Sequence, residues 1–453
     1  WAVRMLGVSL RLEDYETASG LARYIRRHHG EDKDAMAKAS PSILDTLMAL
    51  GDLDEVRRFL VDMATMGITN DSLAQVGRIL ATTMDMDADK PLRQSRSYGL
   101  PSGKLDVFNL VRDTEFKRIS FEQMISLPCP SDVAPLLWAN YLRHFSETDY
   151  LARLNGYLGS HGSPFLVELN ASAENILKRV SFRQQRPMQG LIADGPLVSV
   201  VIAVWNSEDT LEYAIRSILG QQYRNIEILV ADDASTDETS KKLRKFSSDP
   251  RVRIFRSSRN QGPYNIRNRL ISEARGELIT FHDADDIAMP HRIAAQVTAM
   301  IESSARVSMG SWLRIKPNGH IVAFRDGQFL RMCVNSIMFT RTIFDKFGGY
   351  RSVLCGADSE FLELARGHLP AREIISLPQP LVLGLWGSGS LTRTAGIEAD
   401  ELGYRAPSRR VYAGLAGRQR VLGRMIITDA TIENATADAG ILRHPAELSL
   451  REG

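Results

Sequence analysis

Residues 281–292 read FHDADDIAMPHR and join an apolar run to a cluster of acids. Phe281 ends the apolar run, and three aspartates follow at once. They are Asp283, Asp285 and Asp286. Pro290 then marks the start of a helix, because proline is favoured in the first helical turn. A strand that delivers carboxylates to its carboxyl end is where an α/β protein holds a divalent cation and a phosphate ligand.

The residues before this stretch alternate between short β-branched runs and helical segments. Strands are predicted at residues 198–204, 226–231, 252–255 and 278–281. Helices are predicted between them at residues 210–221, 237–246 and 264–274. This alternation implies a mostly parallel sheet with helices on both faces and right-handed crossovers. Ligands are therefore expected at the carboxyl ends of the strands.

Polar clusters follow three of these predicted strands, at residues 205–208, 232–237 and 283–286. One such cluster alone is a weak signal, because Asp, Asn and Ser are common in turns and at helix starts. For Ser235 and Asp237, helix capping is the favoured interpretation. Since the three clusters end successive strands of one sheet, they are expected to converge on one site.

The first part of the chain has the spacing of helical hairpins and no strand pattern. Apolar residues recur at intervals of three and four in 21–25 and again in 59–63. Similar helices begin near Asp14 and Asp52, an offset of about 38 residues that is within the range of helical repeats. A tetratricopeptide-like domain and an irregular helical domain both agree with this pattern.

We therefore divide the chain into four parts. They are an all-α helical hairpin domain at 1–90, a helical and irregular connecting region with a linker at 91–196, an α/β domain at 197–395, and a helical C-terminal extension at 396–453. The linker is placed at the polar residues 183–187 and 194–196. The C-terminal extension is expected to pack on the α/β domain rather than on a membrane surface.

Charge and cysteine content exclude several classes of protein. The 56 basic and 54 acidic residues nearly balance, so no overall field favours nucleic acid. The three cysteines, Cys129, Cys333 and Cys355, are odd in number and form no CxxC pair, which argues against a disulfide framework or a zinc site. Their number and spacing indicate a reducing compartment. No apolar run approaches the roughly 20 residues of a membrane span, and no signal-peptide pattern is present. We expect a cytoplasmic protein, with peripheral association at the inner face of the cell membrane as an option.

Other common enzyme signatures are missing. A Gly-rich dinucleotide fingerprint does not follow the first predicted strand, and there is no nucleophile elbow of a Ser-His-Asp hydrolase. His282, His291 and His320 share no metal-ligand spacing, so each is interpreted as structural or solvent-facing.

Five segments of the chain follow one another in a fixed order. They are VSVVIAVWN, SILGQQYRNIEILVADDASTDET, NQGPYNIRN, GELITFHDADD and GADSEF. In this order and spacing they resemble the inverting nucleotide-sugar glycosyltransferases of family 2, which have the Rossmann-like GT-A fold. The resemblance covers about residues 197–394. It does not extend to the N-terminal helices.

The resemblance implies a nucleotide-sugar site at the strand ends. The residues concerned are Val204, Trp205, Asn206, Glu208, Asp232, Arg267 and Asp283. Val204 and Trp205 would border the base, and Asp232 would accept a hydrogen bond from the base edge. Arg267 would lie near the diphosphate, and Asp283 would approach the ribose.

The resemblance also implies a metal ligand and a catalytic base. Asp285 matches the metal-binding acid of the family's DxD motif, with Mn²⁺ or Mg²⁺ as the cofactor, while Asp286 would cap the next helix or support the shell of the site. Oxygen ligands suit such a hard cation beside a diphosphate. Asp358 resembles the catalytic acid that removes a proton from the acceptor hydroxyl. Glu360 is the competing choice, and a helix N-cap is the structural alternative for Asp358.

Several positions depart from the family's pattern. Ala357 replaces the first acid of the usual ED pair, and Ala203 stands where the family often has proline. Glu363 or Leu364 lies where an arginine commonly follows the catalytic acid. The QxxRW signature of processive membrane synthases is missing, which disfavours a polymerase with its own channel. Trp386 and the loop after it are candidates for a lid over the diphosphate, and a plain surface loop is the alternative.

The implied function is a metal-dependent inverting glycosyltransferase, of the hexosyl- or N-acetylhexosaminyl-transferase class. It would move a sugar from a nucleotide donor, UDP-linked, to a glycan or lipid-linked acceptor in bacterial surface polysaccharide biosynthesis. The alternative is a catalytically degenerate GT-A domain that serves as a binding or scaffold protein through its N-terminal helices. The presence of every principal acid argues against degeneracy. A protein partner at the N-terminal helices is expected in either case, and nucleic acid is not.

Overall fold

The computed structural model describes residues 2–11, 15–50, 53–68, 107–126, 131–170, 173, 175–187, 195–324, 327–353, 355–387, 406, 409 and 412. By internal contacts the chain divides into two compact units. The first comprises 1–130, 323–327 and 391–442, and the second comprises 131–322, 328–390 and 443–453. Most of the predicted C-terminal extension and the loop at 388–390 lie outside the described residues. The predicted domain boundaries stay predictions.

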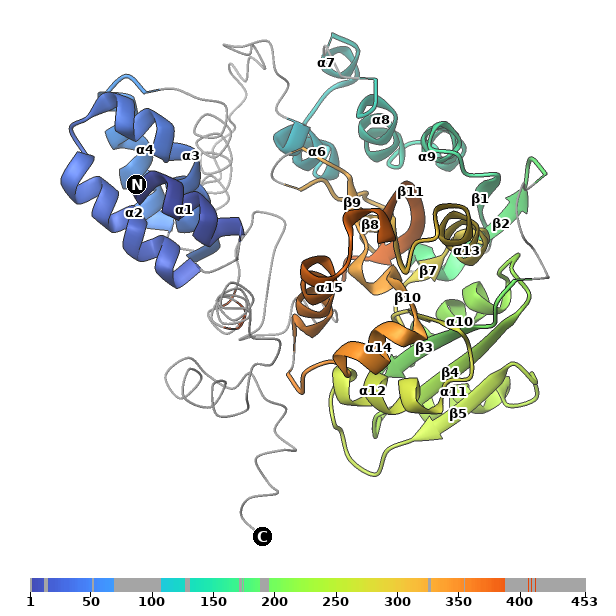
Figure 1. The fold of residues 1–453 in the computed structure, drawn as a ribbon. Helices are drawn as coiled ribbons and strands as arrows, with labels where there is room; N and C mark the ends of the chain where they lie inside the picture. Colours follow the sequence, from blue (N-terminus) through green and yellow to red (C-terminus); the bar gives the residue numbers. More distant parts are fainter. Residues whose placement is uncertain are drawn as a thin grey trace. The chain divides into compact units, whose positions relative to one another are not determined.

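The first unit is helical in its described part, as predicted (Figure 1). Its helices are α1 (Ala2–Arg11), α2 (Tyr15–His29), α3 (Lys33–Leu50), α4 (Leu53–Thr65), α6 (Val107–Glu115) and α7 (Phe121–Ser126). Helices α1 to α4 pack in succession around one core. Ile25 of α2 and Phe59 and Met63 of α4 are buried there, at the apolar spacing that predicted these helices.

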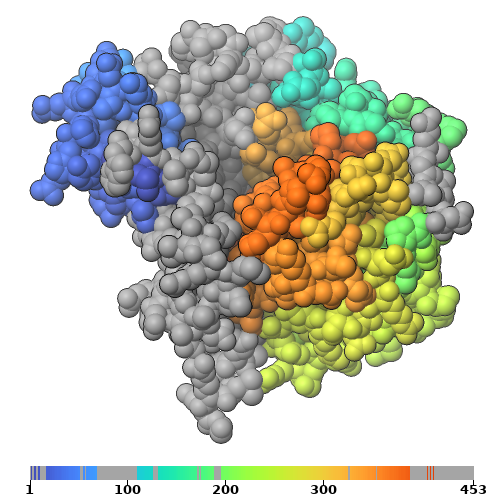
Figure 2. Space-filling model, in the orientation of Figure 1, coloured from blue at the N-terminus to red at the C-terminus, as the bar shows by residue number. Residues whose placement is uncertain are grey.

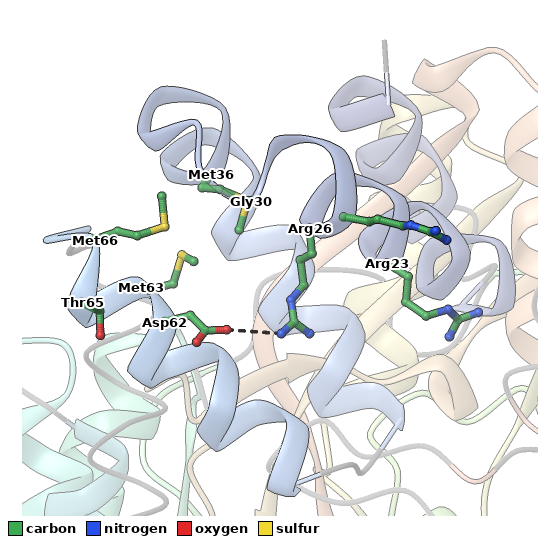
Figure 3. A pocket seen from close by; sticks show the side chains of 9 residues that line it. Arg23, Arg26, Gly30, Met36, Asp62, Met63, Thr65 and Met66 are labelled. Atoms are coloured by element: carbon green, nitrogen blue, oxygen red, sulfur yellow. Dashed lines mark hydrogen bonds and ion pairs between the residues drawn. The ribbon is translucent and has the colours of Figure 1, made fainter.

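A hollow of about 570 Å³ opens between α2, α3 and α4. Its lining combines arginines with methionines, as Figure 3 shows. The lining residues are Arg23, Arg26, Arg27, Gly30, Met36, Asp62, Met63, Thr65 and Met66. Arg26 pairs with Asp62 and with Glu55, and its guanidinium lies over the Phe59 ring. Arg23 and Arg27, in contrast, are exposed.

The second unit begins with two helices and a hairpin. These are α8 (Ala134–Leu142), α9 (Glu147–Ser160), β1 (Phe165–Leu169) and β2 (Val180–Gln184), with the 3₁₀ turn η2 (Ile176–Arg179) between the strands. Ser146 caps α9 by accepting a hydrogen bond from the backbone N–H of Asp149. Arg183 and Gln184, which we predicted in a linker, instead pair with Leu166 and Phe165 of β1. The polar side chains misled that prediction, because an exposed antiparallel edge tolerates them.

A nine-stranded mixed sheet forms the centre of the second unit. Its strands are β3 (Val198–Val204), β4 (Ile226–Asp232), β5 (Val252–Arg256), β6 (Leu278–Phe281), β7 (Ile287–Ala288), β8 (Val307–Ile315), β9 (Leu330–Met332), β10 (Met338–Thr340) and β11 (Ile374–Leu385). The spatial order is β5-β4-β3-β6-β10-β8-β11-β7, with β9 paired to β8. Strands β5, β4, β3 and β6 are parallel, as the β-branched runs predicted.

The other half of the sheet was not foreseen. Strand β10 is antiparallel to both β6 and β8, while β8 and β11 are parallel to each other. Register shifts interrupt the β8–β11 pairing around Pro380, since proline cannot donate to the ladder. The predicted α/β class is confirmed, and the sheet is mixed rather than mostly parallel throughout.

Helices cover both faces of this sheet. They are α10 (Leu211–Leu219), α11 (Thr239–Leu243), α12 (Pro263–Glu273), α13 (Arg292–Ser303), α14 (Arg341–Phe347) and α15 (Ala357–His368), with 3₁₀ turns η3 (Arg244–Phe246), η4 (Val334–Ser336) and η5 (Ala371–Glu373). Alternate β3 residues from Val198 to Val204 pack with α10, α11 and α13. On the other face, α14 borders α12, and Arg341 of α14 donates a hydrogen bond to the carbonyl of Ala274 at the end of α12. Figure 2 shows this surface, with α14 in orange and α12 in yellow-green.

Aromatic side chains fill the space between the sheet, α12, α14 and α15. We call this group the aromatic cluster: Tyr264, Phe281, Phe339, Phe344, Tyr350 and Phe361. Ring centroids lie 4.8 Å apart for Phe344 and Phe361 and 5.3 Å apart for Phe281 and Tyr350. Aromatic contacts of this kind stabilise beyond simple burial. The cluster therefore fixes where α12 and α15 start relative to the end of β6.

Within the described residues, no helix combines the length and apolar character needed to cross a membrane. The three histidines that we interpreted as structural or solvent-facing, His282, His291 and His320, are all buried. Burial lowers the pKa of His291 to about 4, because the charged imidazolium loses its hydration there. Neither ring nitrogen of His291 has a hydrogen-bond partner in the described structure, and the ring stacks on Phe165.

We predict that His291→Phe stabilises the protein at acidic pH. The unfolded chain binds a proton at His291 with a pKa near 6.5, whereas the folded chain does so only near 4, so wild-type stability falls between these values as the pH drops. At pH 5 the loss from this residue is about 2 kcal/mol. Thermal unfolding at pH 7.5 and pH 5 measures it, with exposed His368→Gln as the control. An equal acid-induced loss in His291→Phe and wild type contradicts the prediction.

Candidate active site

A fully buried arginine, Arg292, binds the end of β6 and the first residue of the acidic loop that follows it. The Arg292 guanidinium donates to the Thr280 hydroxyl at 2.8 Å and to the Phe281 carbonyl at 2.7 Å. It also lies 3.2 Å from Nδ1 of His282, whose Nε2 is 3.1 Å from the Asp286 carbonyl. Because arginine only donates, Nδ1 of His282 accepts and Nε2–H donates to Asp286. Burial and the adjacent Arg292 charge lower the His282 pKa to about 3, so the ring stays neutral.

Asp286 belongs to the support of the loop. Its carboxylate accepts a hydrogen bond from the Leu385 backbone N–H at 3.0 Å and lies 3.9 Å from Arg314. Arg314 is itself packed over the Trp312 ring. The capping alternative for Asp286 is wrong, since helix α13 has no side-chain cap at His291. Its burial beside Asp285 holds its pKa well above the ordinary value.

Asp283 faces α12 and the turn before β10. Its carboxylate accepts from Arg267 at 2.7 Å and from the Asn335 amide. The guanidinium of Arg267 is buried between the Tyr264 and Phe281 rings, 5.4 Å and 5.5 Å from their centroids. The predicted diphosphate and ribose residues are thus direct neighbours, and Arg267 orients Asp283.

Asp285 is the carboxylate most suited to a cation. Among the described residues, no side chain forms an ion pair or hydrogen bond with it, while Tyr213 donates to its backbone carbonyl at 2.9 Å. Burial and the nearby Asp283 charge raise the pKa of Asp285 to about 6. Carboxylate oxygens of Asp283, Asp285 and Asp286 all lie within 4.8 Å of one another. An all-oxygen donor set with a spare negative charge fits Mg²⁺ or Mn²⁺.

The loops after β3 and β4 are tied to each other. The Asn206 side-chain oxygen accepts from the Thr236 backbone N–H at 2.9 Å, and Glu208 accepts from the Glu238 N–H at 3.0 Å. Asn206 adopts a left-handed backbone with φ 45°, which asparagine tolerates well. These contacts position the loops, and the roles of Asn206 and Glu208 in nucleotide binding stay predictions.

Trp205 is the exposed member of the first polar cluster, with 55% of its surface accessible. Val204 differs, because its side chain lies in the hydrophobic core and its carbonyl accepts from Asp233 N–H. Asp237 accepts from the first N–H of α11 at Thr239, but the N-cap position of this helix is Glu238, so Asp237 is not the capping residue that we predicted. Ser235 does not cap, since its hydroxyl accepts from Asn206 N–H instead.

Asp232 ends β4 as a buried carboxylate. It accepts hydrogen bonds from the Ser235 backbone N–H at 2.9 Å and from the Ser240 hydroxyl, and Arg256 lies 3.7 Å away. Its neighbour Asp233 accepts from the backbone N–H groups of Gln261 and Gly262, which start the turn into α12. The pair therefore orders the loops around the predicted base site.

Asp358 lies in the first turn of α15. Its Oδ1 accepts from the Tyr264 hydroxyl at 3.0 Å and from the Ser359 backbone N–H at 2.8 Å. The N-cap position is occupied by Gly356, so the capping alternative for Asp358 is wrong. The competing Glu360 lies 3.9 Å from Arg351. Of the two acids, Asp358 is the one tied to the residues around Asp283.

Sequence reasoning missed several residues of this site. They are Tyr213, Tyr264, Arg292, Arg314 and Asn335. Tyr264 lies three residues before Arg267, a spacing that puts both on one helix face and offered a usable signal. Arg314 and Asn335 come from segments with no recognisable pattern, so only the folded chain brings them to the acids.

A mixed α/β sheet with acids at the ends of its parallel strands defines an α/β domain of the GT-A class. Residues 199–359 match the model of the family described as Glycosyl transferase family 2. The match confirms the resemblance to glycosyltransferase family 2 that the five segments indicated.

Curated relatives match the same region. An uncharacterized glycosyltransferase of Haemophilus influenzae is 35% identical over 118 residues, 26% of this chain and 47% of that protein. The Escherichia coli UDP-Glc:alpha-D-GlcNAc-diphosphoundecaprenol beta-1,3-glucosyltransferase WfgD is 33% identical over 131 residues, 29% and 51% of the two chains. The succinoglycan biosynthesis protein ExoO of Rhizobium meliloti is 36% identical over 137 residues, 30% and 37%. The chain spans about half or less of the length of these relatives.

A solved structure of S. aureus TarS residues 1–349 with UDP-GlcNAc is also similar. It has 16% sequence identity and a TM-score of 0.42, and the match covers 53% of this chain and 71% of that one.

We predict that Arg292→Met destabilises the protein strongly. The variant keeps most of the buried volume but leaves the Phe281 carbonyl, the Thr280 hydroxyl and Nδ1 of His282 without their donor, a loss of about 3 kcal/mol. Urea unfolding measures it. Exposed Arg216→Met is the matched control and is expected to change stability by less than about 0.5 kcal/mol. A loss no larger than in the control would show that the guanidinium does not support the loop.

Proposed function

We propose that this chain is a metal-dependent inverting glycosyltransferase that uses a nucleotide-sugar donor. One observation carries the proposal: the acids of the DxD-like loop and Asp358 belong to one connected group. Asp283 pairs with Arg267, Arg267 lies over the Tyr264 ring, and the Tyr264 hydroxyl reaches Asp358. A donor-side acidic cluster beside a separate carboxylate is the arrangement that sugar transfer requires.

The donor is proposed to be UDP-linked and the sugar a hexose or N-acetylhexosamine. The name of the Escherichia coli relative, which specifies UDP-Glc, supports this choice. Trp205 offers an exposed aromatic surface for the base at the end of β3, and the ordered Asp232 loop lies beside it in the sheet.

A divalent cation, Mg²⁺ or Mn²⁺, would be held by Asp285 with a second oxygen from Asp283. When bound, it would supply positive charge that stabilises the departing nucleoside diphosphate. Arg267 pairs with Asp283 at 2.7 Å and orients its carboxylate. Asp286, bound to Leu385 and close to Arg314, keeps the loop in place.

On the acceptor side, Asp358 would take the proton of the attacking hydroxyl. The hydroxyl oxygen forms the new bond to the anomeric carbon as the bond to the diphosphate oxygen breaks, and one such displacement inverts the anomeric centre. The acceptor is proposed to be a glycan or lipid-linked sugar of surface polysaccharide synthesis, used at the cytoplasmic face of the cell membrane. The names of WfgD and ExoO, which specify a diphosphoundecaprenol acceptor and succinoglycan biosynthesis, support this class.

The test measures donor hydrolysis and sugar transfer with a panel of nucleotide sugars and Mn²⁺. We expect Asp285→Ala and Asp358→Asn each to lower transfer by about 100-fold or more, because a positioned base or charge contributes at least that factor. UDP-induced thermal stabilisation is expected to need Mn²⁺ and to be lost in Asp285→Ala but kept in Asp358→Asn. Asp249→Asn, a surface acid paired with Arg251, is the control. Unchanged transfer in both site variants would refute the proposal, and nucleotide binding without turnover would favour the scaffold alternative.

We also propose that the N-terminal unit binds a protein partner through the hollow between α2, α3 and α4, and that the partner segment is acidic. The arginines supply planar donors for carboxylates, while Met36 and Met63 form an adaptable apolar floor. Since both methionines lie at the bottom of the hollow and are buried, a projecting peptide side chain fits this surface better than a flat bilayer does.

A labelled peptide of alternating Glu and Leu tests this partner surface by fluorescence anisotropy on the full chain. We expect binding that falls at least tenfold in Arg23→Glu/Arg27→Glu and weakens with added salt. Arg58→Glu is the control, because Arg58 is exposed but does not line the hollow. Equal affinity for the matching Lys-Leu peptide, or no effect of the charge reversal, would exclude an acidic partner at this position.

A further inference from the structure

The Tyr264 hydroxyl of α12 makes two hydrogen bonds to the start of α15, a segment more than 90 residues away in sequence. It accepts a hydrogen bond from the Gly356 backbone N–H at 3.0 Å and donates to Oδ1 of Asp358 at 3.0 Å. The tyrosine is buried in the aromatic cluster, 5.5 Å from the Tyr350 ring. A single phenol thus fixes both the left-handed glycine at the N-cap of α15 and the carboxylate two residues after it.

The direction of the second hydrogen bond follows from the environment of the phenol. Burial and the nearby Asp358 charge hold the Tyr264 pKa well above its ordinary value, so the hydroxyl keeps its proton. A protonated hydroxyl that already accepts from Gly356 donates its one hydrogen to the carboxylate. Asp358 therefore receives a donor that does not titrate away at any working pH.

The two hydrogen bonds to Asp358 fall on the same oxygen. Tyr264 and the Ser359 N–H both donate to Oδ1, and no described residue donates to Oδ2. A carboxylate held by one oxygen has a fixed plane and leaves the other oxygen available to accept a proton. This asymmetry is what a general base needs, whereas a carboxylate used only for structure gains from having both oxygens bound.

Helix α12 links this base to the donor side. Arg267 follows Tyr264 by one helical turn, and its guanidinium lies 5.4 Å from the Tyr264 ring centroid while it pairs with Asp283. Asn268, the next residue, exchanges hydrogen bonds with the Tyr350 backbone, which fixes α12 against the segment that leads to α15. One turn of α12 therefore contacts both Asp283, in the acidic loop after β6, and Asp358 of α15.

We propose that Tyr264 is the positioning residue of the reaction: it orients Asp358 toward the acceptor hydroxyl and sets its place relative to the donor through α12. The inference rests on the proposed transferase function. It assigns no proton transfer to Tyr264, whose hydrogen stays on the phenol while Oδ2 of Asp358 receives the acceptor proton.

Tyr350 provides a matched control within the same cluster. It is buried and contacts Tyr264, but its hydroxyl has no hydrogen-bond partner in the described structure. Removing that hydroxyl changes the same kind of side chain at the same depth without touching Asp358.

The experiment is a double-mutant cycle of Tyr264→Phe and Asp358→Asn, measured by sugar transfer with Mn²⁺ and by UDP affinity. We expect Tyr264→Phe to lower kcat by 10- to 100-fold and to leave the Kd for UDP within twofold. In the Asp358→Asn background the same change is expected to alter kcat by less than twofold, because the carboxylate to be oriented is absent. Tyr350→Phe is expected to leave kcat within twofold.

Two results would overturn the inference while the proposed function stands. They are a kcat for Tyr264→Phe close to that of wild type, or an equal fold-loss from Tyr264→Phe with and without Asp358, which marks a general structural defect. Tyr264→His retains a ring N–H donor and is expected to recover part of kcat; it replaces the Phe variant in the cycle if that variant does not fold. Absence of transfer by wild type itself, with UDP bound or not, would instead refute the transferase and this inference with it.

Discussion

The acidic loop of this chain depends on one buried cation. Arg292 has no exposed surface, yet its donors are matched by the Thr280 hydroxyl, the Phe281 carbonyl, His282 and Gln296. Such a charge is tolerated in a core only when its hydrogen bonds are made. Here the hydrogen bonds of Arg292 join the end of β6 to the start of α13. The carboxylates that follow β6 can therefore remain crowded without the loop rearranging to separate them.

A second buried arginine, Arg267, stabilises the same loop by pairing with Asp283. Arg267 compensates Asp283 within a shell of aromatic rings, while Asp285 is left with a raised pKa and no described side-chain partner. The protein thus neutralises the acids that shape the site and leaves one charge uncompensated. Uncompensated negative charge at a strand end is unfavourable in the free protein and becomes favourable when a cation arrives, because the cation's field replaces the missing counter-charge.

The parallel half of the sheet was predictable because β3, β4 and β6 are buried apolar runs rich in β-branched residues, and strands β3 and β6 end where the pattern ended. The antiparallel strand β10 was not, since three residues carry no periodicity. In the site, the carboxylates can be recognised in the sequence because they follow predicted strands, whereas the residues that hydrogen-bond to them have no such pattern. Tyr264 and Arg314 are ordinary residues of a helix and a strand, and only non-local packing brings them to Asp358 and Asp286.

Strand β5 forms one outer edge of the nine-stranded sheet, and its free backbone groups face no neighbouring strand of the sheet. An open edge of this kind is a template on which a second chain could add a strand. Arg253 and Arg256 lie along it, with Arg251 just before it, so a second copy aligned there would bring like charges together. The same arginines pair with acids of their own chain, Asp249 and Glu273 among them. The charged side chains along β5 therefore oppose pairing with the same strand of a second copy. This repulsion weakens as salt screens the charges.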